Sequence, residues 1–374
     1  MTEPDRHQAL LRRGRTLQIA SVPTRPPGRG ELRVQLSFVG VCGTDLQILN
    51  GSRPDTAEVL GHEGVGQVVQ AGPAAALALG ESVVFNPAAQ LSSGRILGHN
   101  TSGLFQKFIT VDSRAVEEGL VVAASDYPPT AYAALAEPLA SVIYGHQLIT
   151  IRVRELRTAV VFGAGPVGLL AATYLGGLGV RVLIVHPTQA RLRTVAALGI
   201  VSPTAAVTLC NDLAERLLQL NDGDRPEAAL VCTTRAGAPA ALQHALEVVK
   251  DRGCIDLITN YPEGAVAPLG VNTALLRAVR AENVNGLPLG GRYLVAGWSG
   301  HSVALTGHRG TSPEHLLQAM RVLRLQSAAY ARLITHVTSL AQAGPAIQSL
   351  SEPHTRILGG RECIKLVIDM GAER

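Results

Sequence analysis

The chain has 374 residues, of which 47% are hydrophobic and 39 are glycine, so we expect more than one core and a glycine-rich α/β fold. Its net charge of +4 is small and no dense run of lysine and arginine occurs, which argues against nucleic-acid binding. No apolar leader and no stretch of about 18 apolar residues occur, so we expect neither secretion nor a membrane span.

The N-terminal third has a β-strand pattern. Residues 15–122 alternate apolar and polar side chains, with frequent glycine and proline, as in ELRVQLSFVGVCG and GVGQVVQAG. This alternation predicts mostly antiparallel strands joined by irregular loops. Over residues 127–149 the apolar spacing becomes helical, and we expect this helix to lead into a second domain.

Strand and helix patterns then alternate. Strand-like segments at 157–165, 180–186 and 228–234 are each followed by an apolar helical segment, and another strand pattern follows at 253–260. Such alternation predicts a doubly wound parallel sheet, the Rossmann arrangement. We therefore predict a β-rich catalytic domain at 1–148, a dinucleotide-binding domain at 149–326 with an insertion near 272–302, and a return to the first domain at 327–374.

A glycine turn lies between the first of these strands and its helix. Gly163, Gly165 and Gly168 match G-x-G-x-x-G, with Pro166 and Val167 at the start of the helix. The glycines allow a tight turn and a close approach of backbone to a pyrophosphate, and the helix N-terminus supplies amide donors. We therefore expect a dinucleotide at this turn.

The end of the next strand bears on the choice of dinucleotide. NAD sites usually place an acidic residue there to bind the ribose hydroxyls, but this chain has His186, followed by Thr188. The missing acid, with Arg191 and Arg193 nearby, favours NADP over NAD. The same arginines would also suit a solvated helix face.

A possible metal site is spread over the first domain. Cys42, the His62-Glu63 pair and Glu137 supply a thiolate, an imidazole and carboxylates, the ligand types of a catalytic zinc with one open position. A Lewis acid beside a hydride carrier indicates redox chemistry between an alcohol and a carbonyl compound. Considered alone, Cys42 would more often be a core residue, and Glu137 a charge on a helix face.

In GVCGTDLQILNG and VLGHEGVGQVVQAG the chain resembles the zinc-dependent medium-chain alcohol and polyol dehydrogenases. The likeness extends, with gaps, over nearly the whole chain. It implies a GroES-like catalytic domain in which Cys42 and His62 bind the catalytic zinc, while Glu63 ligates directly or exchanges with water. The EPL glutamate that matches Glu137 is typical of the polyol-type branch.

The resemblance also assigns two residues near Cys42. Thr44 matches the family hydroxyl that hydrogen-bonds the reacting alcohol and passes its proton outward. Asp45 suits a role beside the metal, holding His62 in the right tautomer, although an ordinary turn aspartate fits as well.

The sequence departs from the family pattern in three places. Residues 85–112 lack the four cysteines of the structural zinc site, so we predict one zinc per chain. Gln47 stands where many relatives have the last histidine of the proton relay, so the proton must leave through water or another group. The segment near 272–302 is longer than usual and suggests a substrate lid or a subunit contact. His99 and Asn100 are weaker candidates for the substrate cleft, and Arg309 for the nicotinamide loop.

The sequence thus predicts a zinc-dependent NAD(P) oxidoreductase acting on a secondary alcohol or ketone of a polyol-, sugar- or cyclitol-like molecule. The alternatives are a zinc-free quinone or enone reductase, or a non-catalytic dinucleotide-binding sensor on the same fold. We expect a small-molecule substrate, no nucleic-acid or membrane partner, and a homodimer or homotetramer. The five cysteines are widely spread with no CxxC pair, so we expect the reducing cytoplasm.

Overall fold

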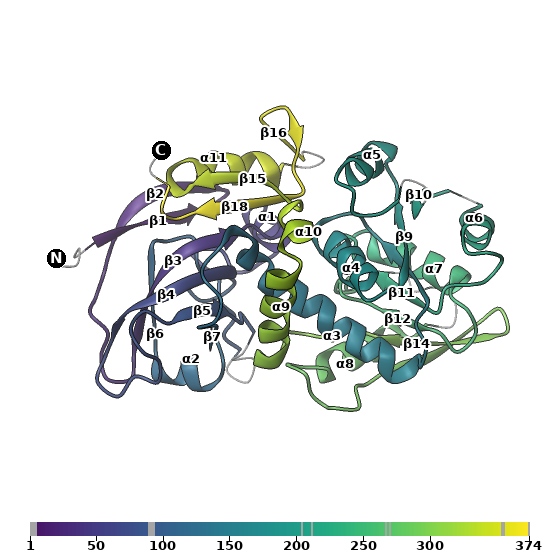
Figure 1. Ribbon diagram of the computed structural model, residues 1–374, viewed down its shortest axis with the longest axis horizontal. Helices are drawn as coiled ribbons and strands as arrows, with labels where there is room; N and C mark the ends of the chain where they lie inside the picture. The colour runs from purple at the N-terminus through teal and green to yellow at the C-terminus, as the bar shows by residue number, and fades with distance from the viewer. Residues whose placement is uncertain are drawn as a thin grey trace. The chain divides into compact units, whose positions relative to one another are not determined.

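The computed structural model describes residues 6–88, 94–202, 205–210, 212–265, 268, 271–352 and 356–372. The chain forms two compact units. Figure 1 shows its helices and strands, coloured by residue number. Unit 1 combines residues 1–138 with 310–374, and unit 2 comprises residues 139–309. The domain bounds expected from the sequence, with changes at 148 and 326, stay predictions.

Unit 1 is built on one mixed sheet. Its strand order is β15-β18-β3-β4-β5-β7, with β6 also paired to β3, and all pairs are antiparallel except β15 with β18. The C-terminal strand β18 pairs with β3, so a segment from the end of the chain joins strands from its first third in this sheet. The strands are β3 (Leu32–Gly40), β4 (Glu63–Ala71), β5 (Ser82–Phe85), β6 (Phe108–Val111), β7 (Val121–Ala123), β15 (Ile334–Ser339) and β18 (Lys365–Asp369).

Smaller elements surround this sheet. A hairpin of β1 (Arg6–Arg13) and β2 (Thr16–Pro23) contacts α11 (Leu340–Ser351), and apolar side chains of all three enter the core of unit 1. The other elements are α1 (Gly43–Leu49), α2 (Ser113–Glu117), the 3-10 helix η2 (Ala131–Leu135), α9 (Pro313–Leu325), α10 (Ser327–Ala331), β16 (Ile357–Leu358) and β17 (Arg361–Glu362).

Unit 2 is a doubly wound sheet, as predicted. Its order is β10-β9-β8-β11-β12-β14-β13, parallel except for the antiparallel pair of β13 and β14. Without β13 this is the strand order of dinucleotide-binding sheets. The strands are β8 (Thr158–Phe162), β9 (Arg181–His186), β10 (Ala206–Thr208), β11 (Ala228–Val231), β12 (Cys254–Asp256), β13 (Leu294–Trp298) and β14 (His301–Thr306).

Helices connect these strands. Every residue of β8 and β11 is buried, as expected for central strands covered on both faces. Helix α3 (Ala136–Arg152) begins in unit 1 and continues into unit 2. The remaining helices are α4 (Pro166–Gly177), α5 (Gln189–Ala197), α6 (Leu213–Leu220), α7 (Ala238–Val248) and α8 (Thr273–Glu282).

Two parts of unit 2 differ from the sequence-based picture. The strand β10 was not predicted, because its three residues are too few to show a pattern. The longer segment near 272–302 folds as α8 and β13, and β13 forms the edge of the sheet. Among the described helices, none is long and apolar enough to cross a membrane.

Candidate active site

Three predicted metal ligands meet in unit 1. The ligand atoms of Cys42, His62 and Glu63 all lie within 4.8 Å of one another, and we call these residues the ligand cluster. Cys42 follows β3, His62 directly precedes β4, and Glu63 begins β4. The strands β3 and β4 pair so that Gly40 lies opposite Glu63. Strand pairing therefore brings together two motifs that are separate in the sequence. Thiolate, imidazole and carboxylate are a donor set that suits zinc.

Asp45 connects the two halves of this cluster. Its buried carboxylate accepts hydrogen bonds from the N–H of Cys42 at 2.9 Å and from the N–H of Gly61 at 3.1 Å. The same carboxylate lies 3.5 Å from Nδ1 of His62. Burial raises the pKa of Asp45, but His62 and the two N–H donors outweigh this effect and lower the pKa below its usual value. A fixed negative charge therefore faces the imidazole.

His62 is buried and lies beside Asp45 and Cys42. Burial lowers its pKa, but Asp45 and Cys42 together outweigh burial and raise the pKa well above its usual value. The raised pKa favours the protonated ring. A metal ion requires the neutral ring, so metal binding at this residue must release a proton.

Lys365 is a residue of this site that the sequence analysis missed. Its ammonium pairs with the carboxylate of Glu63, and both side chains are almost fully buried. Burial lowers the pKa of Lys365, but Glu63, Cys42 and Asp45 together outweigh burial and raise it, which favours the charged ammonium. A Cβ on Gly40 would lie 2.6 Å from the carboxylate oxygen and 2.9 Å from Cε of the lysine, so this position leaves room only for glycine. The signal in the sequence was a lysine inside the apolar strand CIKLVIDM.

Glu137 lies in the first turn of α3, still within unit 1, and its side chain is partly buried. Burial and the neighbouring Glu63 raise its pKa to about 7, although His62 and Lys365 act in the opposite direction. The group of described residues within mutual ligand distance does not include Glu137. Its part in metal binding thus stays a prediction.

The other predicted residues of this region lie nearby. Thr44 and Gln47 are half-buried on α1, which starts directly after Cys42. Asn100 is exposed, and its side chain accepts a hydrogen bond from the N–H of Ile96 at 2.8 Å, so it stabilises its own turn. The ring of His99, in contrast, has its centroid 5.1 Å from that of His62.

The glycine turn of unit 2 has the geometry that the sequence predicts. Gly163 has a φ of +110°, and a Cβ there would lie 2.5 Å from the carbonyl oxygen of Cys232. A Cβ on Gly168 would lie 1.9 Å from the carbonyl oxygen of Gly163. A Cβ on Gly165 would meet nothing within 4 Å, so this glycine faces open space at the N-terminus of α4. Two glycines close the turn, and the third leaves backbone exposed for a ligand.

The helix α4 begins directly after this turn. Gly165 is its N-cap, Pro166 occupies the first turn and Val167 follows. Proline suits this position because it has no N–H to leave unpaired. The free amide groups and the positive end of the helix dipole therefore lie beside the exposed glycine.

His186 ends β9, and no carboxylate takes its place there. The N–H of Thr188, the N-cap of α5, donates to His186 Nδ1 at 3.2 Å. Arg191 is buried on α5, whereas Arg193 is exposed. The solvated-face interpretation therefore fits Arg193 and fails for Arg191. Arg309, at the end of unit 2, is exposed.

Asp256 is a buried acid that the sequence analysis did not single out. It ends β12, and neither carboxylate oxygen has a hydrogen-bond partner among the described residues. Burial raises its pKa to about 7, with Arg280 acting in the opposite direction. The carboxylate packs against Gly145 of α3, where a Cβ would lie 2.4 Å from Oδ2. No sequence signal distinguished this aspartate from one at the end of an ordinary strand.

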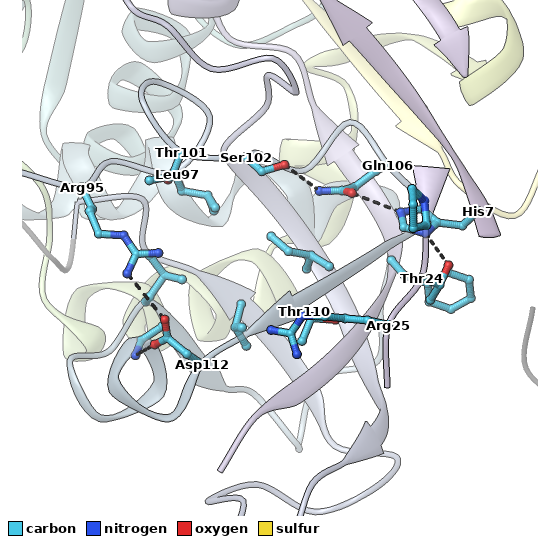
Figure 2. A pocket seen from close by; sticks show the side chains of 16 residues that line it. His7, Thr24, Arg25, Arg95, Leu97, Thr101, Ser102, Gln106, Thr110 and Asp112 are labelled. Atoms are coloured by element: carbon cyan, nitrogen blue, oxygen red, sulfur yellow. Dashed lines mark hydrogen bonds and ion pairs between the residues drawn. The ribbon is translucent and has the colours of Figure 1, made fainter. Parts of the chain in front are cut away.

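A separate pocket of about 360 Å³ lies elsewhere in unit 1 and is drawn in Figure 2. His7 bridges two neighbours there, with Nδ1 2.7 Å from Thr24 Oγ1 and Nε2 3.1 Å from Gln106 Oε1. The amide of Gln106 donates to the carbonyl of Gly103 at 2.6 Å. No residue of the ligand cluster lines this pocket. Because these polar groups hydrogen-bond to each other, we do not assign the reaction to this pocket.

The chain is similar in sequence to known dehydrogenases. The family described as "Alcohol dehydrogenase GroES-like domain" matches residues 28–119. The L-threonine 3-dehydrogenase of Pyrococcus abyssi is 26% identical over 295 residues, which cover 72% of this chain and 79% of that protein. The 2-dehydro-3-deoxy-L-galactonate 5-dehydrogenase of Pseudoalteromonas atlantica is 29% identical over 250 residues, 62% of this chain and 70% of that protein.

Solved structures show the same fold. An alcohol dehydrogenase from Thermotoga maritima aligns with a TM-score of 0.70 over 97% of this chain and 99% of that chain. The two sequences are 19% identical, so this likeness concerns the fold alone.

Proposed function

Because this chain belongs to the zinc-type medium-chain alcohol and polyol dehydrogenase family, we propose that it is a zinc-dependent oxidoreductase. It transfers a hydride between NAD(P) and a secondary alcohol or the matching ketone. The substrate is a polar molecule of the polyol, sugar or cyclitol type. Glu137 in the EPL motif supports this substrate class, as do the relatives named for L-threonine and a galactonate derivative, which are polar and hydroxylated.

One observation carries this proposal: the ligand cluster in unit 1, with its thiolate, imidazole and carboxylate within 4.8 Å of one another. The set fits zinc because the three donors are the types that zinc takes and because a buried imidazole faces a carboxylate across 3.5 Å. A zinc-free reductase would have no use for these donors. When bound, the metal supplies a Lewis acid to the substrate oxygen.

The residues of this chain then divide the work. Cys42 and His62 hold the metal. Glu63 and Glu137 are the carboxylates that complete the set of ligands, and Glu63 binds the metal directly or exchanges with water. Asp45 orients His62. Thr44 serves the reacting oxygen as a hydrogen-bond partner and receives or delivers its proton, as its match to the family hydroxyl implies.

Unit 2 supplies the dinucleotide site in this proposal. The exposed backbone at Gly165, with Gly163, Pro166, Val167 and Gly168 around it, holds the pyrophosphate. At the end of β9, His186 and Thr188 leave room for a 2′-phosphate because no carboxylate repels it, and Arg191 lies on the next helix. We therefore propose that NADP is preferred to NAD.

Two further parts of the proposal concern the molecule as a whole. None of the five cysteines, all of which lie in the described part of the chain, forms a disulfide, which supports a cytoplasmic location. We also propose a homodimer or homotetramer, which size-exclusion chromatography with light scattering tests directly.

The deciding experiment is a substrate panel with both cofactors on protein of measured zinc content. We expect about one zinc per chain and turnover of polar secondary alcohols, and Cys42→Ala should abolish turnover while the cofactor still binds. Cys210→Ala is the matched control, because Cys210 lies in unit 2, far along the chain from the cluster, and should leave turnover unchanged. Full activity of the metal-free protein, or of Cys42→Ala, would refute the zinc assignment.

A further inference from the structure

His99 is held beside the ligand cluster by its backbone. The carbonyl of His99 accepts a hydrogen bond from the N–H of Ala57 at 2.7 Å. A Cβ on Gly98, or on Gly103, would lie 2.4 Å from the carbonyl oxygen of Gly61, so this turn packs backbone against backbone. Gly61 directly precedes the ligand His62. The turn that carries His99 therefore cannot move away from the cluster without losing this contact.

The side chain of His99 is fixed as well. Its Nδ1 lies 3.0 Å from a carboxylate oxygen of Asp55, and Arg53 Nε holds the other oxygen at 2.8 Å. The side chains of His99 and Asp55 are only 12% and 15% exposed, so both partners are largely withdrawn from water. With Nδ1 occupied, the ring has one remaining polar atom, Nε2. This atom has no hydrogen bond to any residue that the structure describes.

We propose that His99 binds the substrate, and that its Nε2 hydrogen-bonds a hydroxyl on the carbon next to the reacting carbon. The inference rests on the proposed function and narrows its substrate class to vicinal diols. The centroids of the two imidazole rings are 5.1 Å apart, so a molecule reacting beside His62 places its neighbouring substituent near His99. A hydroxyl can donate or accept, so this contact forms whichever way the ring is protonated.

A methyl group at the same place would cover Nε2 without giving it a partner. A site that buries an unpaired polar atom in this way disfavours the analogue that lacks the hydroxyl, by about tenfold to hundredfold. Asp55 and Arg53 act through His99 as positioning residues, because they contact the ring and not the substrate.

The test compares kcat/KM for 2,3-butanediol and 2-butanol, which differ by the hydroxyl in question. We expect His99→Phe to lower the diol-to-monoalcohol ratio about tenfold to hundredfold, while the rate with 2-butanol changes by less than about threefold. Asp55→Asn should lower the ratio by a smaller factor, mainly through KM for the diol. His244→Phe is the matched control, because His244 lies on α7 in unit 2, and its ratio should equal that of the wild type.

The outcomes separate the two proposals. If the wild type oxidises alcohols but His99→Phe keeps the wild-type ratio, the role of His99 is refuted and the proposed function stands. If the wild type turns over no alcohol with either cofactor, the proposed function fails and this inference fails with it. Should His99→Phe not fold, His99→Leu repeats the comparison with a smaller apolar side chain. A loss that appears with an amino alcohol such as threonine, but not with the diol, overturns the assignment of a hydroxyl.

Discussion

Lys365→Met should destabilise the metal-free protein strongly. The substitution leaves the carboxylate of Glu63, a member of the ligand cluster, buried without its lysine partner, and both partners of this pair are at most 2% exposed. Removing one partner of a buried ion pair typically costs about 3–5 kcal/mol, because the remaining charge has no compensation. Zinc would supply a positive charge to the same carboxylate, so the loss should be smaller in the metal-loaded protein.

Urea unfolding measures this effect in the wild type, the single variants Lys365→Met and Glu63→Gln, and the double variant, each with chelator and with zinc. The double variant should recover most of the lost stability without metal, because neither charge of this ion pair remains. Arg13→Met is the control: the ion pair of Arg13 with Glu58 has side chains 51% and 71% exposed, so its loss should cost less than about 1 kcal/mol. A cost for Lys365→Met as small as that of Arg13→Met would refute the reasoning.

Three more predictions concern other residues. Zinc binding to the metal-free protein near pH 7 should release protons, because the pKa of His62 is raised and the metal needs the neutral ring. Calorimetry in buffers of different ionisation enthalpy measures this proton release. Identical binding heats in all buffers would contradict the prediction. Burial raises the pKa of Asp256 from the usual 3.8 to about 7, so the folded protein keeps a proton that the unfolded chain has lost, and stability should fall as pH rises through this window. At about 1.4 kcal/mol per pKa unit, the effect on the free energy of unfolding amounts to at most about 4 kcal/mol. Asp256→Asn should therefore flatten the dependence of Tm on pH between about 4 and 8. Parallel curves of Tm against pH for the wild type and the variant would disprove this prediction. Thr44→Val should lower kcat by about 10²–10⁴-fold and leave cofactor affinity unchanged, since it removes only the hydroxyl; an unaltered rate and pH profile would exclude Thr44 from the reaction.

The predicted site residues that the structure brings together share a local signal in the sequence. Gly163, Gly165 and Gly168 lie within one turn, and strand and helix patterns on both sides fix how that turn folds. Cys42 and His62 were separate motifs, but each adjoins a strand, and pairing of β3 with β4 is the simplest antiparallel arrangement.

The residues that were missed depend on distant parts of the chain. Lys365 pairs with Glu63 across 302 positions of sequence, and only the return of β18 to the first sheet brings them together. Asp55 and His99 meet through two irregular loops, whose course no periodic pattern reports. Local patterns thus indicate the elements and the chemistry, while side-chain partners follow from the topology of the sheet.

Asp45 both joins the two ligand-bearing segments and faces His62, and this bears on the order of folding and metal binding. Its two backbone hydrogen bonds, from the N–H groups of Cys42 and Gly61, link the two ligand-bearing segments through protein groups alone. Small zinc modules, in contrast, are unfolded until the metal arrives. In this chain we therefore expect the polypeptide to reach its native state first and to acquire an ion afterwards. On the proposed function, an ion lost later would be replaced without unfolding, and the supply of zinc would govern how much of the protein is active and not how much of it is folded.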